Sequence, residues 1–91
     1  MTLEGRVAIV TGSAGGLGRS HVRYLARKGA RVVVNDLSQD AVDSVAREII
    51  DAGGEAMAIA GSVTDDAARE IWPEGWESPK PYIRIVKQPT G

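Results

Sequence analysis

The chain has 91 residues, of which 43% are hydrophobic and 25% charged, with a formal net charge of −1. This length allows one small domain, and the near-neutral charge gives no general attraction to nucleic acid or an acidic membrane. With no cysteine and one histidine, disulfides and cysteine- or histidine-rich metal sites are excluded. The N-terminus lacks a signal-peptide pattern and no apolar run has membrane-spanning length, so we expect a cytoplasmic protein with no membrane partner.

Short apolar runs alternate with helical periodicity through residue 71. The predicted elements are, in chain order, a strand over 6–11, a helix over 16–29, a strand over 30–36, a helix over 38–53, a strand over 55–60 and a helix after Thr64. We expect Ser38 and Thr64 to cap the second and third helices. This alternation predicts an α/β fold with a three-stranded parallel sheet, in the order 3-2-1, and flanking helices.

The first predicted helix carries one apolar stripe. Leu17, His21 and Leu25 recur every four residues, and Val22 and Ala26 widen that face. We expect this stripe to pack on the sheet. His21 is then a half-buried packing residue rather than a catalytic base.

A glycine-rich turn, TGSAGGLG over residues 11–18, joins the first strand to the first helix. Gly12 allows a tight turn, Gly16 lets the backbone approach a pyrophosphate, and Gly18 lets the helix pack closely on the sheet. The helix N-terminus then faces the phosphates. A merely connecting turn needs fewer glycines, and a nucleoside-triphosphate loop would have glycine at Ser13 and lysine at Arg19. The strand, turn and helix together predict a dinucleotide site.

Asp36 ends the second predicted strand, roughly twenty residues beyond the turn. A carboxylate at that spacing accepts hydrogen bonds from the adenosine ribose and repels a 2′-phosphate. Leu37 follows it, and no arginine stands there to receive that phosphate, so NAD is favoured over NADP. Two alternatives stay open: Asp36 could instead cap the helix over 38–53, and Arg19 could reach a phosphate from the turn.

On these residues the chain resembles the short-chain dehydrogenase/reductase family. Thr11-Gly12-x-x-x-Gly16-x-Gly18 matches the cofactor motif of that family, and Val32–Leu37 (VVVNDL) resembles its 3-hydroxyacyl-CoA dehydrogenase and multifunctional β-oxidation branch. The resemblance covers residues 3 to about 70 and implies a partial Rossmann fold. It also implies that Ser62 and Val63 contact the adenine, where the wider family usually has Asp-Val.

The predicted cofactor is NAD, and no metal ligand is predicted. The predicted cofactor-binding residues are Gly12, Ser13, Gly15, Gly16, Leu17, Gly18, Asp36, Leu37, Ser62 and Val63.

The family's later motifs, Asn-Asn-Ala-Gly, a catalytic serine and Tyr-x-x-x-Lys, do not follow Ile71. Tyr24 and Lys28 have the last spacing, but they lie on the helix that begins at the glycine turn. We therefore interpret Tyr24 as a packing residue and Lys28 as solvated. The chain is expected to be an oxidoreductase by family that is inactive in isolation. The alternatives are a non-catalytic dinucleotide-binding module and a non-functional remnant of an interrupted gene.

The composition changes after Ile71, because all four prolines and both tryptophans lie in the last twenty residues. We expect residues 1–71 to form a truncated dinucleotide-binding domain and 72–91 an irregular tail. The first strand would then be an exposed edge that is open to self-association. Alternatively, the segment 82–87 (YIRIVK) fills that edge as one extra strand.

Overall fold

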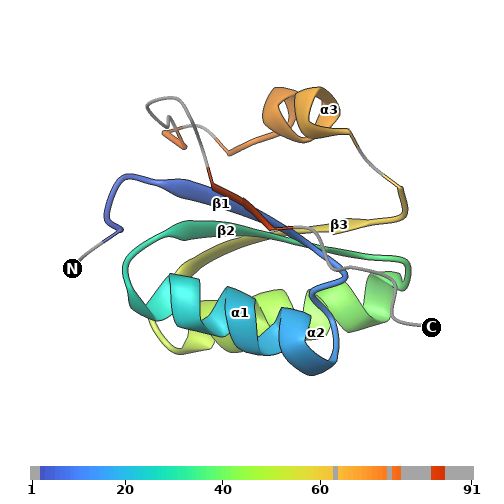
Figure 1. Cartoon of the computed structure of the whole chain (residues 1–91), viewed down its shortest axis with the longest axis horizontal. Coiled ribbons are helices and arrows are strands. Elements are labelled where there is room, and N and C mark those ends of the chain that lie inside the picture. Colours follow the sequence, from blue (N-terminus) through green and yellow to red (C-terminus); the bar gives the residue numbers. More distant parts are fainter. Residues whose placement is uncertain (1–2, 63, 74, 77–82, 86–91) are drawn as a thin grey trace.

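The computed structural model describes residues 3–62, 64–73, 75–76 and 83–85. Its elements are β1 (Val7–Thr11), α1 (Gly16–Arg27), β2 (Arg31–Asp36), α2 (Gln39–Asp51), β3 (Glu55–Ala60), α3 (Asp65–Glu70) and β4 (Ile83–Ile85). The strands form one parallel sheet in the order β3-β2-β1-β4. Helices α1 and α2 cover one face and α3 lies over the other (Figure 1). The predicted α/β class and the 3-2-1 order of the first three strands are confirmed.

The sheet has a fourth strand, so the expectation of three strands was incomplete. β4 pairs in parallel with β1, and Ile83 lies opposite Ala8 and Ile85 opposite Val10. β4 belongs to the segment 82–87 that we considered as an alternative filler of this edge, and the rest of that segment lies outside the described residues. Along Ala8–Val10, β1 is therefore an inner strand of the sheet. The exposed edge, from which we expected self-association, is absent there.

The sheet is apolar on both faces because both are covered, as the continuous apolar runs of β1 and β2 indicated. On the α1 and α2 side, the core includes Ala8, Val10, Val32 and Val34 from the strands. On the other side, the core consists of Val7, Ile9, Val33, Ala68 and Trp76. Residues that follow the last predicted helix thus complete the second core.

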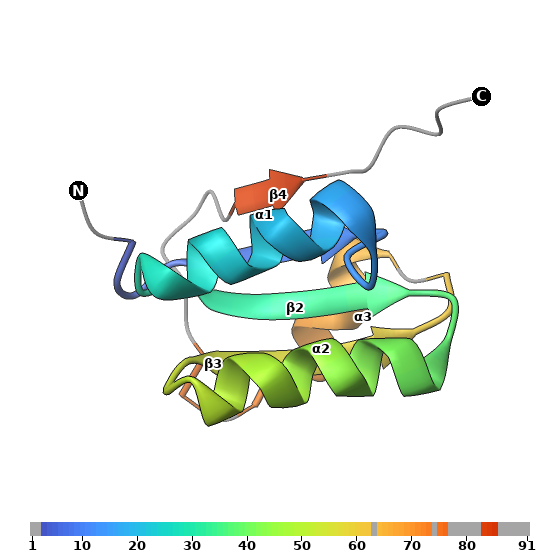
Figure 2. The ribbon, with the colours of Figure 1, turned by 90° about the horizontal axis from the view of Figure 1, so that it is seen from below.

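Helix α1 packs on the sheet through only part of the predicted stripe. Its buried residues are Gly18, Val22 and Leu25, whereas Leu17 is 73% exposed and His21 is also exposed. The expectation of a half-buried His21 was therefore wrong. Val22, Leu25 and the partly buried Ala26 belong to the predicted stripe and do pack on the core. The prediction failed only at Leu17 and His21, and Gly18 lies on the buried face in their place. Figure 2 shows α1 and α2 side by side on the same face of the sheet.

Both predicted helix caps are present. The Ser38 hydroxyl accepts a hydrogen bond from the Ala41 N–H (3.3 Å), and the Thr64 hydroxyl accepts one from the Ala67 N–H (3.2 Å). Because Ser38 is the N-cap of α2, the alternative that Asp36 caps this helix is wrong. The Asp36 carboxylate therefore has a role other than capping α2.

Replacing Trp76 tests whether the residues after α3 stabilise the fold. Trp76 is 8% exposed within the second core, so Trp76→Ala is expected to lower the free energy of unfolding by about 3–5 kcal/mol. Chemical denaturation followed by circular dichroism measures this change. Ile71→Ala is the control, because Ile71 is 59% exposed and its truncation should change stability by about 0.5 kcal/mol or less. Equal, small effects of both substitutions would contradict the packing of Trp76.

Candidate functional site

The glycine turn leads from the carboxyl end of β1 into α1, and its own geometry requires three glycines. Gly12 has φ +65° and Gly16 has φ +56°, a left-handed conformation that residues with a Cβ rarely adopt. A Cβ added to Gly18 would lie 2.1 Å from the Gly12 carbonyl oxygen. Gly18 therefore allows α1 to approach the turn backbone, whereas we had expected its close contact to be with the sheet.

The open side of the turn is formed by Gly15, Gly16 and Leu17. The two glycines are exposed, and a Cβ built on either would meet no atom within 4 Å. Because the first N–H groups of a helix have no intrahelical partner, the start of α1 offers donors and a positive dipole end on this side. The turn thus has the space and polarity that an anionic phosphate group requires.

Ser13 lies on the inner side of the turn and is fully buried. Its hydroxyl accepts a hydrogen bond from the Asn35 N–H (2.9 Å) and lies 3.3 Å from the Asn35 carbonyl, to which it donates. The Ser13 N–H donates to the same carbonyl at 3.0 Å. The side chain of Ser13 therefore acts on a ligand site only through the position that it gives to the turn.

Asn35 is a site-positioning residue that we missed in the sequence. It is 6% exposed, and its Nδ2 donates to the carbonyl oxygens of Ile59 and Gly61, each at 2.9 Å. With the bonds to Ser13, Asn35 joins the glycine turn, the end of β2 and the end of β3. The available signal was an amide within a run predicted to be buried, because buried polar groups are almost always hydrogen-bonded.

Asp36 lies next to the glycine turn and is half-buried. Its Oδ2 accepts a hydrogen bond from the Ala14 N–H (3.1 Å) and its Oδ1 accepts one from the Leu37 N–H (2.8 Å). A carboxylate offers about four acceptor positions, so these two bonds leave capacity for ligand hydroxyls. The structure thus brings the predicted ribose acceptor into direct contact with the predicted phosphate turn.

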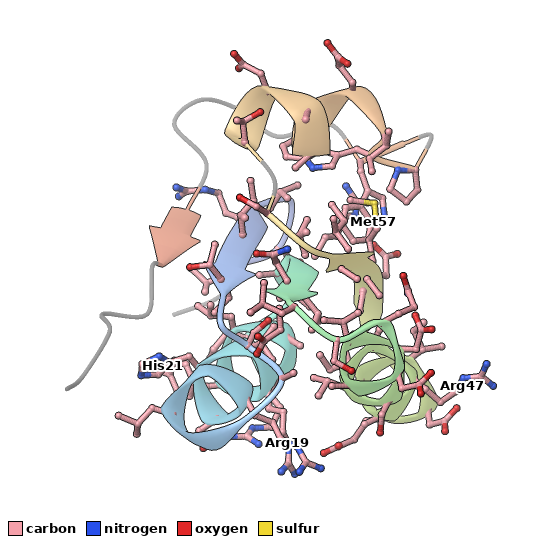
Figure 3. All side chains as sticks on the ribbon, turned by 90° about the vertical axis from the view of Figure 1, so that its right-hand side faces the viewer. Arg19, His21, Arg47 and Met57 are labelled. Atoms are coloured by element: carbon pink, nitrogen blue, oxygen red, sulfur yellow. The ribbon has the colours of Figure 1, made fainter. Side chains whose placement is uncertain are left out.

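The predicted site residues that the structure describes gather at the carboxyl edge of the sheet. Figure 3 looks onto this edge, where β1, β2 and β3 end. Leu37 is 80% exposed there, and Ser62 is exposed just beyond β3. Val63 lies outside the described residues.

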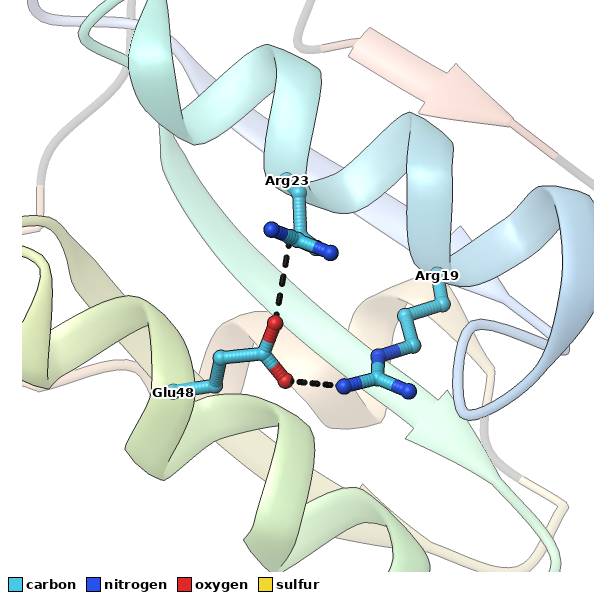
Figure 4. A network of polar contacts seen from close by, with 3 residues as sticks. All are labelled: Arg19, Arg23 and Glu48. Carbon is cyan, nitrogen blue, oxygen red and sulfur yellow. Dashed lines mark hydrogen bonds and ion pairs between the residues drawn. The ribbon is translucent and has the colours of Figure 1, made fainter.

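Arg19, the predicted alternative phosphate ligand, is directed toward α2. Its Nη2 lies 2.5 Å from Glu48 Oε2, and the Arg23 Nε lies 3.1 Å from Glu48 Oε1 (Figure 4). The hydrogen bond from Arg19 is the main cause that lowers the pKa of Glu48; burial opposes it, and the charges of both arginines add to it. The Glu48 carboxylate is therefore ionised at neutral pH.

Tyr24 and Lys28 lie toward the end of α1 opposite the turn. Tyr24, which we interpreted as a packing residue, is 52% exposed. The Lys28 ammonium lies 5.5 Å from the centroid of the Tyr24 ring, a distance typical of a cation–π contact. These two residues interact with each other away from the carboxyl edge.

Within the described ranges, no three or more His, Cys, Asp or Glu side chains gather as a metal would require. No helix in that part of the chain combines the length and the apolar character needed to cross a bilayer.

Two alanine substitutions test the geometry of the turn. Gly18→Ala is expected to destabilise the protein by about 1–3 kcal/mol, since the added methyl group meets backbone that must move. Gly15→Ala is the matched control, because Gly15 is extended at φ −152° and a Cβ there meets nothing. Thermal unfolding of the two variants measures the difference. Equal stabilities would show that α1 does not approach the turn as closely as described.

Comparison with known proteins identifies the same segment. The family model of the short chain dehydrogenases matches residues 6–72. Hydroxyacyl-CoA dehydrogenase ChsB1 of Mycobacterium tuberculosis is 45% identical over 73 residues, which are 75% of this chain and 23% of that protein. Peroxisomal multifunctional enzyme type 2 of Drosophila melanogaster is 51% identical over 73 residues, 70% of this chain and 12% of that protein. The chain therefore spans less than a quarter of the length of these relatives.

Solved structures give a consistent result. A 7α-hydroxysteroid dehydrogenase complexed with NADH and 7-oxo glycochenodeoxycholic acid is 39% identical, with a TM-score of 0.65 over 67% of this chain and 24% of that one. A structure from Beutenbergia cavernae with bound NADP, described as an NAD(P)-dependent gluconate 5-dehydrogenase, is also 39% identical to this chain. Its TM-score is 0.65 over 77% of this chain and 28% of that one. Both neighbours were solved with a nicotinamide dinucleotide, and this chain matches only a part of each.

Proposed function

Because the chain belongs to the short-chain dehydrogenase family, we propose that it is the NAD(H)-binding N-terminal part of an oxidoreductase of that family. The observation that carries this proposal is the contact between Asp36 and the glycine turn at Ala14. It joins an acceptor for ribose hydroxyls to a helix N-terminus suited to phosphates, which are the two recognition elements of a dinucleotide site.

We propose the following cofactor-binding roles for the residues described at the carboxyl edge and, from the family resemblance alone, for Val63. The backbone of the turn, from Gly12 to Gly18, and the start of α1 receive the pyrophosphate, while the Asp36 carboxylate accepts hydrogen bonds from the ribose. Leu37 borders the ribose, and Ser62 and Val63 contact the adenine. Ser13 and Asn35 act indirectly, since their hydrogen bonds hold the turn and the strand ends in place. When bound, the cofactor supplies or accepts the hydride of the family's chemistry.

We further propose that these 91 residues bind NAD(H) without catalysing hydride transfer. After Ile71 the given sequence contains neither an Asn-Asn-Ala-Gly motif nor a serine accompanied by Tyr-x-x-x-Lys. The one match to Tyr-x-x-x-Lys, Tyr24 and Lys28, lies toward the far end of α1. Purified protein is expected to bind NADH saturably and to show no hydride transfer with a panel of hydroxy and keto substrates. Turnover by this chain would contradict the non-catalytic part of the proposal, and the absence of a cooperative unfolding transition would favour the non-functional remnant.

Removing the Asp36 carboxylate tests whether this residue binds the ribose of the cofactor. Asp36→Ala is expected to weaken NADH binding by about 1.5–3 kcal/mol, because a charged acceptor of ligand hydroxyls is lost. Isothermal titration calorimetry measures the affinity, and unfolding curves establish that the variant is folded. Asp40→Ala is the matched control: it removes the same charge from an exposed position in the first turn of α2. If both variants bind NADH as the unmodified chain does, Asp36 is not the ribose ligand.

A further inference from the structure

Arg19 is the only basic residue in the segment 12–20 and lies on the first turn of α1, directly after Gly18. A guanidinium at this place is well suited to a phosphate group, because arginine donates in a planar fork that matches phosphate oxygens. The structure directs it elsewhere: its Nη2 is bound to Glu48 of α2. Figure 3 shows Arg19 between α1 and α2, on the side of the two helices that faces away from the sheet.

The backbone position of Glu48 is set by α2, which packs on the sheet. Glu48 belongs to the same turn of α2 as Val45 and Ile49, which are buried in the core and fix that helix on the sheet. One of its carboxylate oxygens pairs with Arg19 and the other with Arg23. Glu48 thus extends from a packed helix with its side chain 31% exposed, whereas the Arg19 side chain is 47% exposed.

From this geometry we infer that Glu48 determines cofactor specificity: by holding Arg19 against α2 it withholds a phosphate ligand from the carboxyl edge, so that the chain prefers NAD(H) to NADP(H). The inference rests on the proposed function and adds a second element to it. Asp36 repels the 2′-phosphate at the ribose, while Glu48 holds Arg19, the basic residue next to the glycine turn, against α2. Glu48 is a positioning residue, since it acts only through Arg19.

The main test is the Glu48→Gln variant of the full chain, titrated with NADH and with NADPH at low ionic strength. Binding is followed by the fluorescence of the reduced nicotinamide. Freed from Glu48, Arg19 can approach the 2′-phosphate, so the affinity for NADPH relative to NADH is expected to rise. Exposed ion pairs are individually weak, so we expect a rise of about two- to fivefold. If Glu48 contributes to stability alone, its substitution weakens the binding of NADH and NADPH together and leaves the ratio of the two affinities unchanged.

Three control variants separate this effect from a general change of charge. Asp51→Asn removes the same charge one turn further along α2, and it should change the ratio less than Glu48→Gln does. Arg19→Gln combined with Glu48→Gln should return the ratio to that of the unmodified chain or lower it. Arg23→Gln leaves the Glu48 carboxylate to Arg19 alone, so the ratio should stay the same or fall. Circular dichroism of each variant establishes that it is folded.

The outcomes distinguish this inference from the proposed function. Binding of neither NADH nor NADPH by the unmodified chain overturns both. If the chain binds NADH, and the shift in Glu48→Gln equals that in Asp51→Asn or persists without Arg19, only the role of Glu48 is overturned. A rise specific to Glu48→Gln that requires Arg19 supports it. A rise in Arg23→Gln as large as that in Glu48→Gln overturns it, because that variant keeps the pair between Glu48 and Arg19.

Discussion

The buried hydrogen bonds of Asn35 are the interaction on which the carboxyl edge depends. Its amide binds two carbonyl oxygens at the end of β3, and its backbone binds Ser13 in the glycine turn. Because a buried polar group that loses its partner is costly, these bonds favour one arrangement of the three strand ends. Asp36 follows Asn35 directly, and its carbonyl accepts a hydrogen bond from Gly61. A ligand would thus meet a surface whose parts are already aligned.

The orientation of α1 follows from the contact between Gly18 and the turn. Since the helix backbone must lie against the Gly12 carbonyl, Val22 and Leu25 face the sheet. Leu17 is then left in solvent at the carboxyl edge, and Arg19 is brought within reach of α2. Gly18, a residue without a side chain, therefore determines which residues of α1 are buried in the core. It also determines which residues of α1 face a ligand and which face α2.

The strands β1 to β3 and the helix caps could be predicted, because each depends on residues close together in the chain, and the order of these three strands follows from the short helical crossovers that join them. Only part of the α1 stripe could be predicted: Leu17 and His21 fit the helical spacing of Leu25, but the contact of Gly18 with the turn leaves them in solvent. Asn35 was missed because its partners lie at the ends of other elements. The pair between Arg19 and Glu48 joins positions that no local pattern relates. β4 was predicted only as an alternative, since the short segment containing it carries no signal that selects a sheet edge.

The pairing of β4 with β1 has a consequence for the order of folding. Among the described strands these are the first and the last in sequence, and they are neighbours in the sheet. Contacts between residues so far apart in sequence close a long loop and form slowly, whereas β1, α1 and β2 are joined by short connections. We expect β1 and β2 to assemble first, with the second edge of β1 unpaired until β4 arrives. During synthesis that edge stays open until β4 has left the ribosome, and before that point the edge of β1 is exposed to aggregation.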